Sequence, residues 1–176
     1  MKKTNILVLM SLLISLEIIL TRFLAIQTPI VRIGFGFLPI AFSSILFGPI
    51  IGGITAALAD ILGMIIAPKG PYFPGFTISA LITGIVYGIF LFQKPKSLTR
   101  ISLASCIIIL FINIGLNTLW VSILTGNPFF AVLPPRIIKE LAMFPIQVVV
   151  IYTAWKYTGT YIEMHYLNAA KKKYSP

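Results

Sequence analysis

Long apolar runs, separated by short polar or proline-containing breaks, dominate the chain. The first run covers residues 5–26 and ends before the polar segment 27–29, where proline and polar groups stop a helix. The apolar stretch 33–67 is too long for one crossing of a bilayer, and the sequence GPIIGG at 48–53 is the natural point to divide it. The pattern therefore predicts two short spans that meet at a tight turn.

Later breaks divide the rest of the chain into three further runs. PKGPYFPG at 68–75 precedes the fourth run, and the charged segment KPKSLTR at 94–100 follows it. The sixth run is expected after a loop, TGNPFFAVLPP, at 125–135. The predicted spans cover residues 5–26, 35–48, 49–67, 74–92, 101–124 and 135–158 of a single domain, residues 1–176.

Helices fit these runs better than strands. Backbone groups cannot stay unpaired in hydrocarbon, and runs of this length do not alternate as the strands of a membrane barrel do. Hydrophobic residues make up 58% of the 176-residue chain and charged residues only 10%, which excludes an ordinary soluble domain. We therefore predict an all-α membrane protein with six transmembrane helices.

Positive charges are distributed unequally between the two ends of these spans. The chain has 14 Lys and Arg residues against 4 Asp and Glu residues. With the N-terminus inside, nine cations lie on the inner side and five on the outer side, so the sequence predicts cytoplasmic N- and C-termini and contact with anionic lipid rather than nucleic acid. The inner nine are Lys2, Lys3, Lys94, Lys96, Arg100, Lys156, Lys171, Lys172 and Lys173, and the outer five are Arg22, Arg32, Lys69, Arg136 and Lys139.

Three carboxylates within the spans need a partner or a polar cavity, because an ionisable group inside a membrane is costly. Arg22 lies five residues after Glu17, which is not an ideal helical pairing distance and leaves an interhelical partner open. Arg136 and Glu140 lie four residues apart, so Glu140 either forms an ion pair or contacts a ligand. Asp60 has no local base and either faces a polar cavity or neutralises a distant arginine.

The sequence carries no catalytic or metal-binding signature. HExxH, Gly-x-Ser-x-Gly, a phosphate loop and a Cys/His cluster are all absent. The single histidine, His165, follows the last span, where a solvated interfacial residue is expected. We therefore expect a non-catalytic protein with no catalytic residues, no metal and no cofactor.

Aromatic residues, amides and cations are predicted to meet at the outer ends of the helices. Asn113 and Asn117 lie four residues apart on one helical face at the level of several cations. This mixture suits a planar polar ring with a carboxylate tail, whereas interfacial belts by themselves explain many of the aromatic residues. The aromatic residues are Phe35, Phe37, Tyr72, Phe73, Phe76, Trp120, Phe129 and Phe130.

Two segments resemble a known family. RIGFGFLPIAFSSILFGPIIGGITAALADILG, from Arg32, and PKGPYFPGFTISALITGIVYGIFLF, from Pro68, are similar to the folate-specific S component of energy-coupling factor (ECF) transporters, and the similarity covers nearly the whole chain. It implies a subunit of a vitamin importer in the bacterial cytoplasmic membrane, which binds folate outside with high affinity. It also implies a transmembrane coupling protein and two ABC-type ATPases as partners, which would hydrolyse the ATP.

The folate resemblance and the local chemistry together give candidate contacts. A pterin ring is planar and forms hydrogen bonds, and the glutamate tail carries carboxylates, so aromatic residues and arginines complement them. We expect Arg32 and Arg136 to contact the carboxylates with support from Lys139, and Asn117 to contact the pterin. The expected stacking walls are Tyr72, Phe73, Phe76 and Trp120, and the expected rim is Arg32 with Phe35 and Phe37.

A pair of small residues on the first span predicts a helix contact. Ser11 and Ser15 form a small-xxx-small pattern, which allows another helix to approach closely. They occupy the positions of an Ala-x-x-x-Ala motif that contacts the coupling protein in the family, so the resemblance implies a partner contact where the pattern alone also permits internal packing. Two other functions stay open: an S component for another vitamin or heteroaromatic precursor, and a membrane assembly protein without a transport function.

Overall fold

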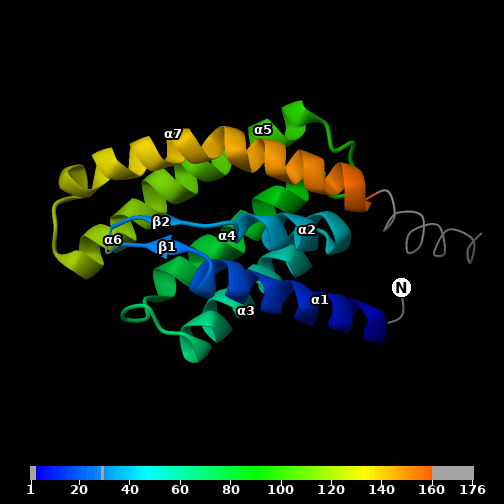
Figure 1. Ribbon diagram of the computed structural model, residues 1–176, viewed down its shortest axis with the longest axis horizontal. Helices are drawn as coiled ribbons and strands as arrows, with labels where there is room; N and C mark the ends of the chain where they lie inside the picture. The colour runs from blue at the N-terminus through cyan, green and yellow to red at the C-terminus, as the bar shows by residue number, and fades with distance from the viewer. Residues whose placement is uncertain (1–2, 29, 160–176) are drawn as a thin grey trace, which may run out of the picture.

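A computed structural model describes residues 3–28 and 30–159. The prediction of an all-α membrane protein is confirmed, and one hairpin of two-residue strands accompanies the helices (Figure 1). In chain order the elements are α1 (Lys3–Ile18), the π-helical turn η1 (Ile19–Phe23), β1 (Ile26–Gln27), β2 (Arg32–Ile33), α2 (Phe37–Phe47), α3 (Pro49–Ile66), α4 (Pro74–Leu91), α5 (Leu98–Ile107), the π-helical segment η2 (Ile108–Leu116), α6 (Asn117–Thr125), α7 (Phe129–Ala154) and η3 (Trp155–Gly159).

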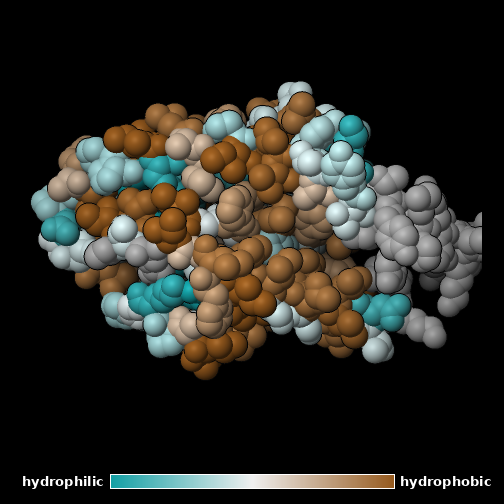
Figure 2. Space-filling view, in the orientation of Figure 1, coloured by the Kyte–Doolittle hydropathy of each residue, from teal (hydrophilic) through white to brown (hydrophobic). Residues whose placement is uncertain are grey.

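Within residues 3–28 and 30–159, five helical stretches are long and apolar enough to cross a membrane. Apolar side chains cover much of the surface, above all over α1, while hydrophilic residues gather mostly toward the two ends (Figure 2). Helix α2 is apolar but has only 11 residues, too few to cross a hydrocarbon core of about 30 Å at about 1.5 Å per residue. The five stretches are Thr4–Phe23, Pro49–Ile66, Pro74–Leu91, Leu98–Thr125 and Phe129–Gly159.

The last long helix begins earlier than the sequence predicts. Residues 125–135 are expected as a loop, whereas α7 starts at Phe129 and contains Pro134 and Pro135. Two amides, those of Ala131 and Val132, bond to the carbonyl of Pro128 over 2.9 and 3.3 Å and start the helix ahead of the prolines. The prolines then lie inside the helix, where each removes one backbone donor.

The first and last described residues lie at the same end of the bundle (Figure 1). The opposite end carries the β1–β2 hairpin, the segment 67–73 between α3 and α4, and the turn at Gly126, and we call it the loop end. The assignment of the loop end to the outside of the membrane stays a prediction from the charge bias. Four of the lysines that create that bias lie outside the described residues: Lys2, Lys171, Lys172 and Lys173. His165 lies outside them as well.

Helices α3 and α4 approach closely because glycines line their contact. A Cβ atom on Gly84 of α4 would lie 2.6 Å from the carbonyl oxygen of Gly52 on α3, and a Cβ atom on Gly88 would collide with Pro49. Ser44 Oγ on α2 donates to the carbonyl of Gly84 over 2.8 Å. Small residues let membrane helices pack backbone to backbone, and α3 and α4 pack in this way.

The hydrophobic core lies beside this contact, where α2, α4, α5, η2 and α7 meet. The apolar side chains of this core are removed from solvent where these helices meet. The largest fully buried side chains of the core are Tyr87, Leu91, Ile101, Ile108, Ile112 and Ile151. A polar cavity lies at the loop end.

Candidate functional site

A cavity of about 930 Å³ opens at the loop end of the bundle. It is lined by residues of α1, η1, β2, α2, α3, α4, η2, α6 and α7, together with the segment 67–73, and its volume suits a ligand of drug size. Five basic and three acidic side chains face it, which leaves a formal excess of two positive charges when all are ionised. These residues are Arg22, Arg32, Lys69, Arg136, Lys139, Glu17, Asp60 and Glu140.

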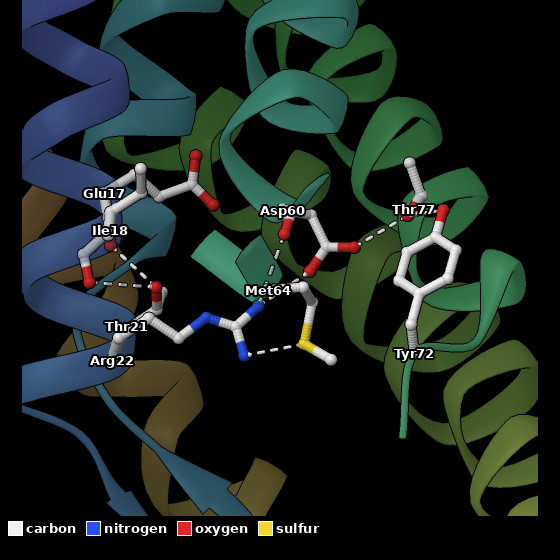
Figure 3. Close-up of polar contacts among 8 residues, drawn as sticks. All are labelled: Glu17, Ile18, Thr21, Arg22, Asp60, Met64, Tyr72 and Thr77. Carbon is white, nitrogen blue, oxygen red and sulfur yellow. Dashed lines mark hydrogen bonds and ion pairs between the residues drawn. The ribbon is translucent and has the colours of Figure 1, made fainter. Parts of the chain in front are cut away.

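A buried ion pair joins η1 to α3 beside the cavity. Arg22 is only 3% exposed, and its Nη2 atom lies 3.2 Å from Asp60 Oδ1. Thr77 of α4 donates its hydroxyl to Asp60 Oδ2 over 2.8 Å, and the Tyr72 hydroxyl lies 3.1 Å from Thr77 Oγ1. Figure 3 shows this chain of contacts crossing from η1 through α3 to α4. Asp60 thus meets both expectations, since it neutralises a distant arginine and lines the cavity.

A second polar network connects α7, η2 and α6. Lys139 Nζ lies 2.6 Å from Glu140 Oε1, and Asn113 Nδ2 donates to Glu140 Oε2 over 3.2 Å. Asn117 Nδ2 then donates to Asn113 Oδ1 over 3.3 Å. Asn113 lies within the π-helical segment η2, and such wide turns are frequent at functional sites.

Arg136 has a different partner from the one that its spacing suggests. It does not pair with Glu140 four residues later; Nη1 donates to the carbonyl of Ile30 over 2.9 Å and Nη2 to the carbonyl of Asn113 over 3.1 Å. These bonds hold the tip of the hairpin against η2. Arg136 therefore lines the cavity and also links the hairpin to η2 at its wall.

Several polar atoms at the cavity have no partner among the described residues. The buried atoms are Asn117 Oδ1, Arg136 Nε and Arg22 Nε, and buried polar atoms without partners call for a ligand or another explanation. The Arg32 side chain likewise forms no hydrogen bond or ion pair with any of the described residues. Burial and the nearby Arg22 lower the pKa of Arg32 from its ordinary value, so an anion beside it would favour its charged form. The described residues contain no group of three His, Cys, Asp or Glu side chains suited to a metal.

An aromatic wall forms where α4 meets α6. The ring centroids of Phe73 and Trp120 lie 5.5 Å apart, and those of Phe73 and Phe76 lie 6.2 Å apart. Trp120 Nε1 donates to Ser79 Oγ over 3.1 Å, which fixes the indole. A Cβ atom on Gly75 would lie 2.6 Å from atoms of both Phe73 and Trp120, so only glycine leaves room for the two rings here.

The structure brings together most of the predicted ligand contacts. Trp120 packs on the cavity-lining Phe73 but does not line the cavity itself. Phe35 does not line the cavity either; it is 44% exposed and packs against Phe37. Ser11 and Ser15 do not line the cavity: they lie on an exposed face of α1, where each hydroxyl bonds to its own helix backbone over 2.9 Å. The predicted contacts that line the cavity are Arg32, Phe37, Tyr72, Phe73, Phe76, Asn117, Arg136 and Lys139.

Glu17 was not among the ligand contacts predicted from the sequence, although it was marked as a carboxylate that needs a partner or a polar cavity. Glu17 lines the cavity together with Thr21, one helical turn later on the same face of the first span. Its signal was an ionisable group inside a membrane span without a local partner, which is by default a functional hypothesis.

Comparisons with known proteins agree on one family. The sequence profile described as "ECF transporter, substrate-specific component" matches residues 5–154. The chain is 51% identical over 156 residues to the folate transporter FolT of Clostridium novyi (strain NT), covering 89% of this chain and 91% of the relative. It is 34% identical over 151 residues to the folate transporter FolT of Leuconostoc mesenteroides, covering 82% and 81%. A crystal structure of FolT bound with folic acid matches with a TM-score of 0.81 at 39% identity, over 86% of this chain and 92% of that one.

Proposed function

The chain belongs to the family of ECF transporter substrate-specific components, and from this membership we propose that its cavity captures folate for import. The protein is a multi-pass protein of the cell membrane and a non-catalytic transporter subunit. The observation that carries the proposal is one cavity that combines an aromatic wall with an excess of two positive charges. Folate matches both features, because it joins a planar pterin ring to a tail with two carboxylates.

The basic residues have different proposed shares in binding the tail. Arg32 is the main carboxylate contact, because its guanidinium lines the cavity and has no partner among the described residues. Arg136 contributes through Nε, since its two Nη atoms are bonded to backbone carbonyls. Lys139 is tied to Glu140 at 2.6 Å and supports the site by its charge. We assign the stacking surfaces for the ligand ring to Tyr72, Phe73 and Phe76, with Phe37 beside them, whereas Trp120 supports Phe73 from outside the cavity.

Asn117 is the proposed partner of the pterin ring, and its network fixes which atom it offers. An ionised Glu140 only accepts hydrogen bonds, so Asn113 turns its NH₂ group to Glu140 and its carbonyl oxygen to Asn117. Asn117 must then donate its own NH₂ group to Asn113, which leaves Asn117 Oδ1 as a buried, open acceptor. A donor on the ligand ring, such as an amino group, satisfies this atom.

Replacing Asn117 with leucine should therefore weaken folic acid binding. We expect an increase of about 10-fold in the Kd, because the variant loses one buried hydrogen bond of the complex. Isothermal titration of the purified protein measures this, with Asn127→Leu as a control because Asn127 is exposed in the turn at the loop end. Equal affinities for Asn117→Leu and the control would remove Asn117 from the site.

A thermal-shift panel tests the choice of folate. Purified protein is heated with folic acid, riboflavin, thiamin, biotin or pantothenate, because a ligand that binds only the native state raises the melting temperature. Folic acid at 100 times its Kd should stabilise the protein by about 2.7 kcal/mol, and the other vitamins should produce no shift. A shift with riboflavin and none with folic acid would assign the cavity to a different vitamin.

ATP hydrolysis and coupling belong to partner chains in this proposal. Neither a phosphate loop nor another ATPase signature occurs in the sequence, so two ABC-type ATPases and a transmembrane coupling protein supply these functions. Ser11 and Ser15 offer a contact for the coupling protein, because they lie on an exposed face of α1 with their hydroxyls already bonded within the helix. A partner helix is thus able to approach without leaving a polar group unpaired.

Enlarging this pair should separate docking from ligand binding. Ser11→Leu together with Ser15→Leu should reduce co-purification with the coupling protein about 10-fold, because the larger side chains hold the helices apart. The Kd for folic acid should stay within about 2-fold of the unchanged protein, since neither serine lines the cavity. Ala142→Leu, at an exposed position of α7, is the matched control, and an equal loss of the coupling protein in both would rule out a specific role for the serines.

A further inference from the structure

We propose that Glu17 binds the amino-bearing edge of the ligand's heteroaromatic ring. The inference rests on the proposed function, because it assigns one more contact to folate within the same cavity. It concerns a residue outside the predicted contacts and gives α1 a direct part in recognising the ligand.

Glu17 is the carboxylate at the cavity that is available to a ligand. Its residue is 7% exposed and lines the cavity, yet its side chain has no hydrogen bond or ion pair within residues 3–28 and 30–159. The other two carboxylates are occupied, Asp60 by Arg22 and Thr77, and Glu140 by Lys139 and an amide. Figure 3 shows the Glu17 carboxylate extending from α1 toward the side on which Asp60 lies.

The neighbouring charges do not give Glu17 a structural partner. The charged groups that face it are Asp60 on α3, Arg22 on η1 and Arg32 on β2. Arg22 is committed to Asp60 and to Met64 Sδ, and Arg32 forms no ion pair with Glu17 in the structure. A buried carboxylate without a partner destabilises the ligand-free protein. A residue of this kind is expected where a bound ligand supplies the missing donors.

The chemistry of the pterin ring fits an ionised carboxylate. A 2-amino-4-oxopteridine carries an exocyclic amino group next to a ring N–H, which present two nearly parallel donors. A carboxylate accepts such a pair through its two oxygens, in the same geometry in which it accepts the two N–H groups of an arginine. The bond is charge-assisted and therefore stronger than a bond between neutral groups.

The depth of Glu17 agrees with a ring-first orientation. Glu17 lies more than one helical turn further from the loop end than Arg22, and the cavity also reaches Ala80 and Thr83 inside α4. Residues of the loop end, such as Lys69, line the opening. A ring at the level of Glu17 leaves the charged tail of the ligand nearer the opening.

The test compares two ligands on two proteins. The ligands are folic acid and its analogue with a methyl group in place of the 2-amino group, and the proteins are the unchanged chain and Glu17→Gln, which keeps the shape but loses the charge. Isothermal titration should show Glu17→Gln binding folic acid about 10- to 100-fold more weakly, because a charge-assisted contact is lost. For the methyl analogue the two proteins should differ at least about 3-fold less than they do for folic acid, since the amino donor of the pair is already missing and only the ring N–H remains.

Each other outcome has a definite meaning. Equal weakening for both ligands, or no weakening for either, overturns the role of Glu17 while folate binding stands. Failure of the unchanged protein to bind folic acid overturns the proposed function itself. Should Glu17→Gln not fold, Glu17→Asp replaces it: this variant keeps a carboxylate and should still prefer folic acid to the methyl analogue, and loss of that preference overturns the proposal.

The melting temperature without ligand separates this role from a structural one. Removal of an unpartnered buried charge should leave the ligand-free Glu17→Gln protein at least as stable as the unchanged protein. A fall of about 4 °C or more would instead show that Glu17 stabilises the fold, and would contradict the proposal.

Discussion

Arg32→Ala is expected to weaken folic acid binding by about 100-fold, because it removes a cation that faces the ligand's carboxylates in a partly desolvated cavity. Arg32 lines the cavity and is not tied to another side chain in the described part of the protein. Burial and the nearby Arg22 disfavour its positive charge and lower its pKa. An anionic ligand beside Arg32 would stabilise the charged form, so the attraction between the two should be strong. Isothermal titration with folic acid measures the loss.

The same titration with the primary amide of pteroic acid, which has neither the glutamate tail nor any carboxylate, isolates the carboxylate contact. Arg32→Ala should change the Kd for this amide by less than about 3-fold, because that ligand has no carboxylate for Arg32 to bind. Arg100→Ala, at the start of α5 and outside the cavity lining, is the control and should bind both ligands normally. If Arg32→Ala binds folic acid as tightly as Arg100→Ala does, Arg32 is not a ligand contact.

Asp60→Ala is expected to cause the largest loss of stability, about 3 kcal/mol of the free energy of unfolding. The change leaves the guanidinium of Arg22 buried without its carboxylate, and the neutral Met64 Sδ is its main remaining partner. Relocation of the arginine is restricted because α3 passes beside it: a Cβ atom on Gly63 would lie 2.9 Å from Arg22 Nε. Denaturation of the purified protein in detergent, without ligand, measures the loss.

The double variant Arg22→Met with Asp60→Leu provides the control for this ion pair. Replacing both charges by apolar side chains of similar size removes the buried cation as well, so most of the lost stability should return. Asp60→Ala should therefore be less stable than the double variant. The opposite order would mean that Asp60 stabilises the fold by a contact other than the one with Arg22.

The helices could be predicted from the sequence more fully than their ends and irregularities. Apolar runs bounded by Gly48, Pro49 and Pro74 mark helix boundaries, because glycine and proline act on the local backbone. The early start of α7 at Phe129 could not be read in this way, since prolines at 134 and 135 suggest a loop. The π-helical segment η2 follows from packing between helices, which a single sequence does not display.

The residue types of the site were predictable, but not their partners. Cations and aromatic residues near the helix ends pointed to an anionic planar ligand, and Arg32 and Phe73 do line one cavity. Helical spacing suggested a pair between Arg136 and Glu140, whereas the structure gives Arg136 two backbone carbonyls. Glu17 was marked as a costly buried carboxylate but not as a ligand contact, because its place at the cavity depends on contacts between helices distant in sequence.

Folate capture in this cavity is tested most directly by a structure of the purified protein with folic acid. The predicted result is one folic acid molecule inside the cavity, with its ring beside Phe73 and Asn117 and its tail carboxylates within hydrogen-bond distance of Arg32. Folic acid bound outside this cavity, or a cavity that stays empty at saturating folic acid, would contradict it.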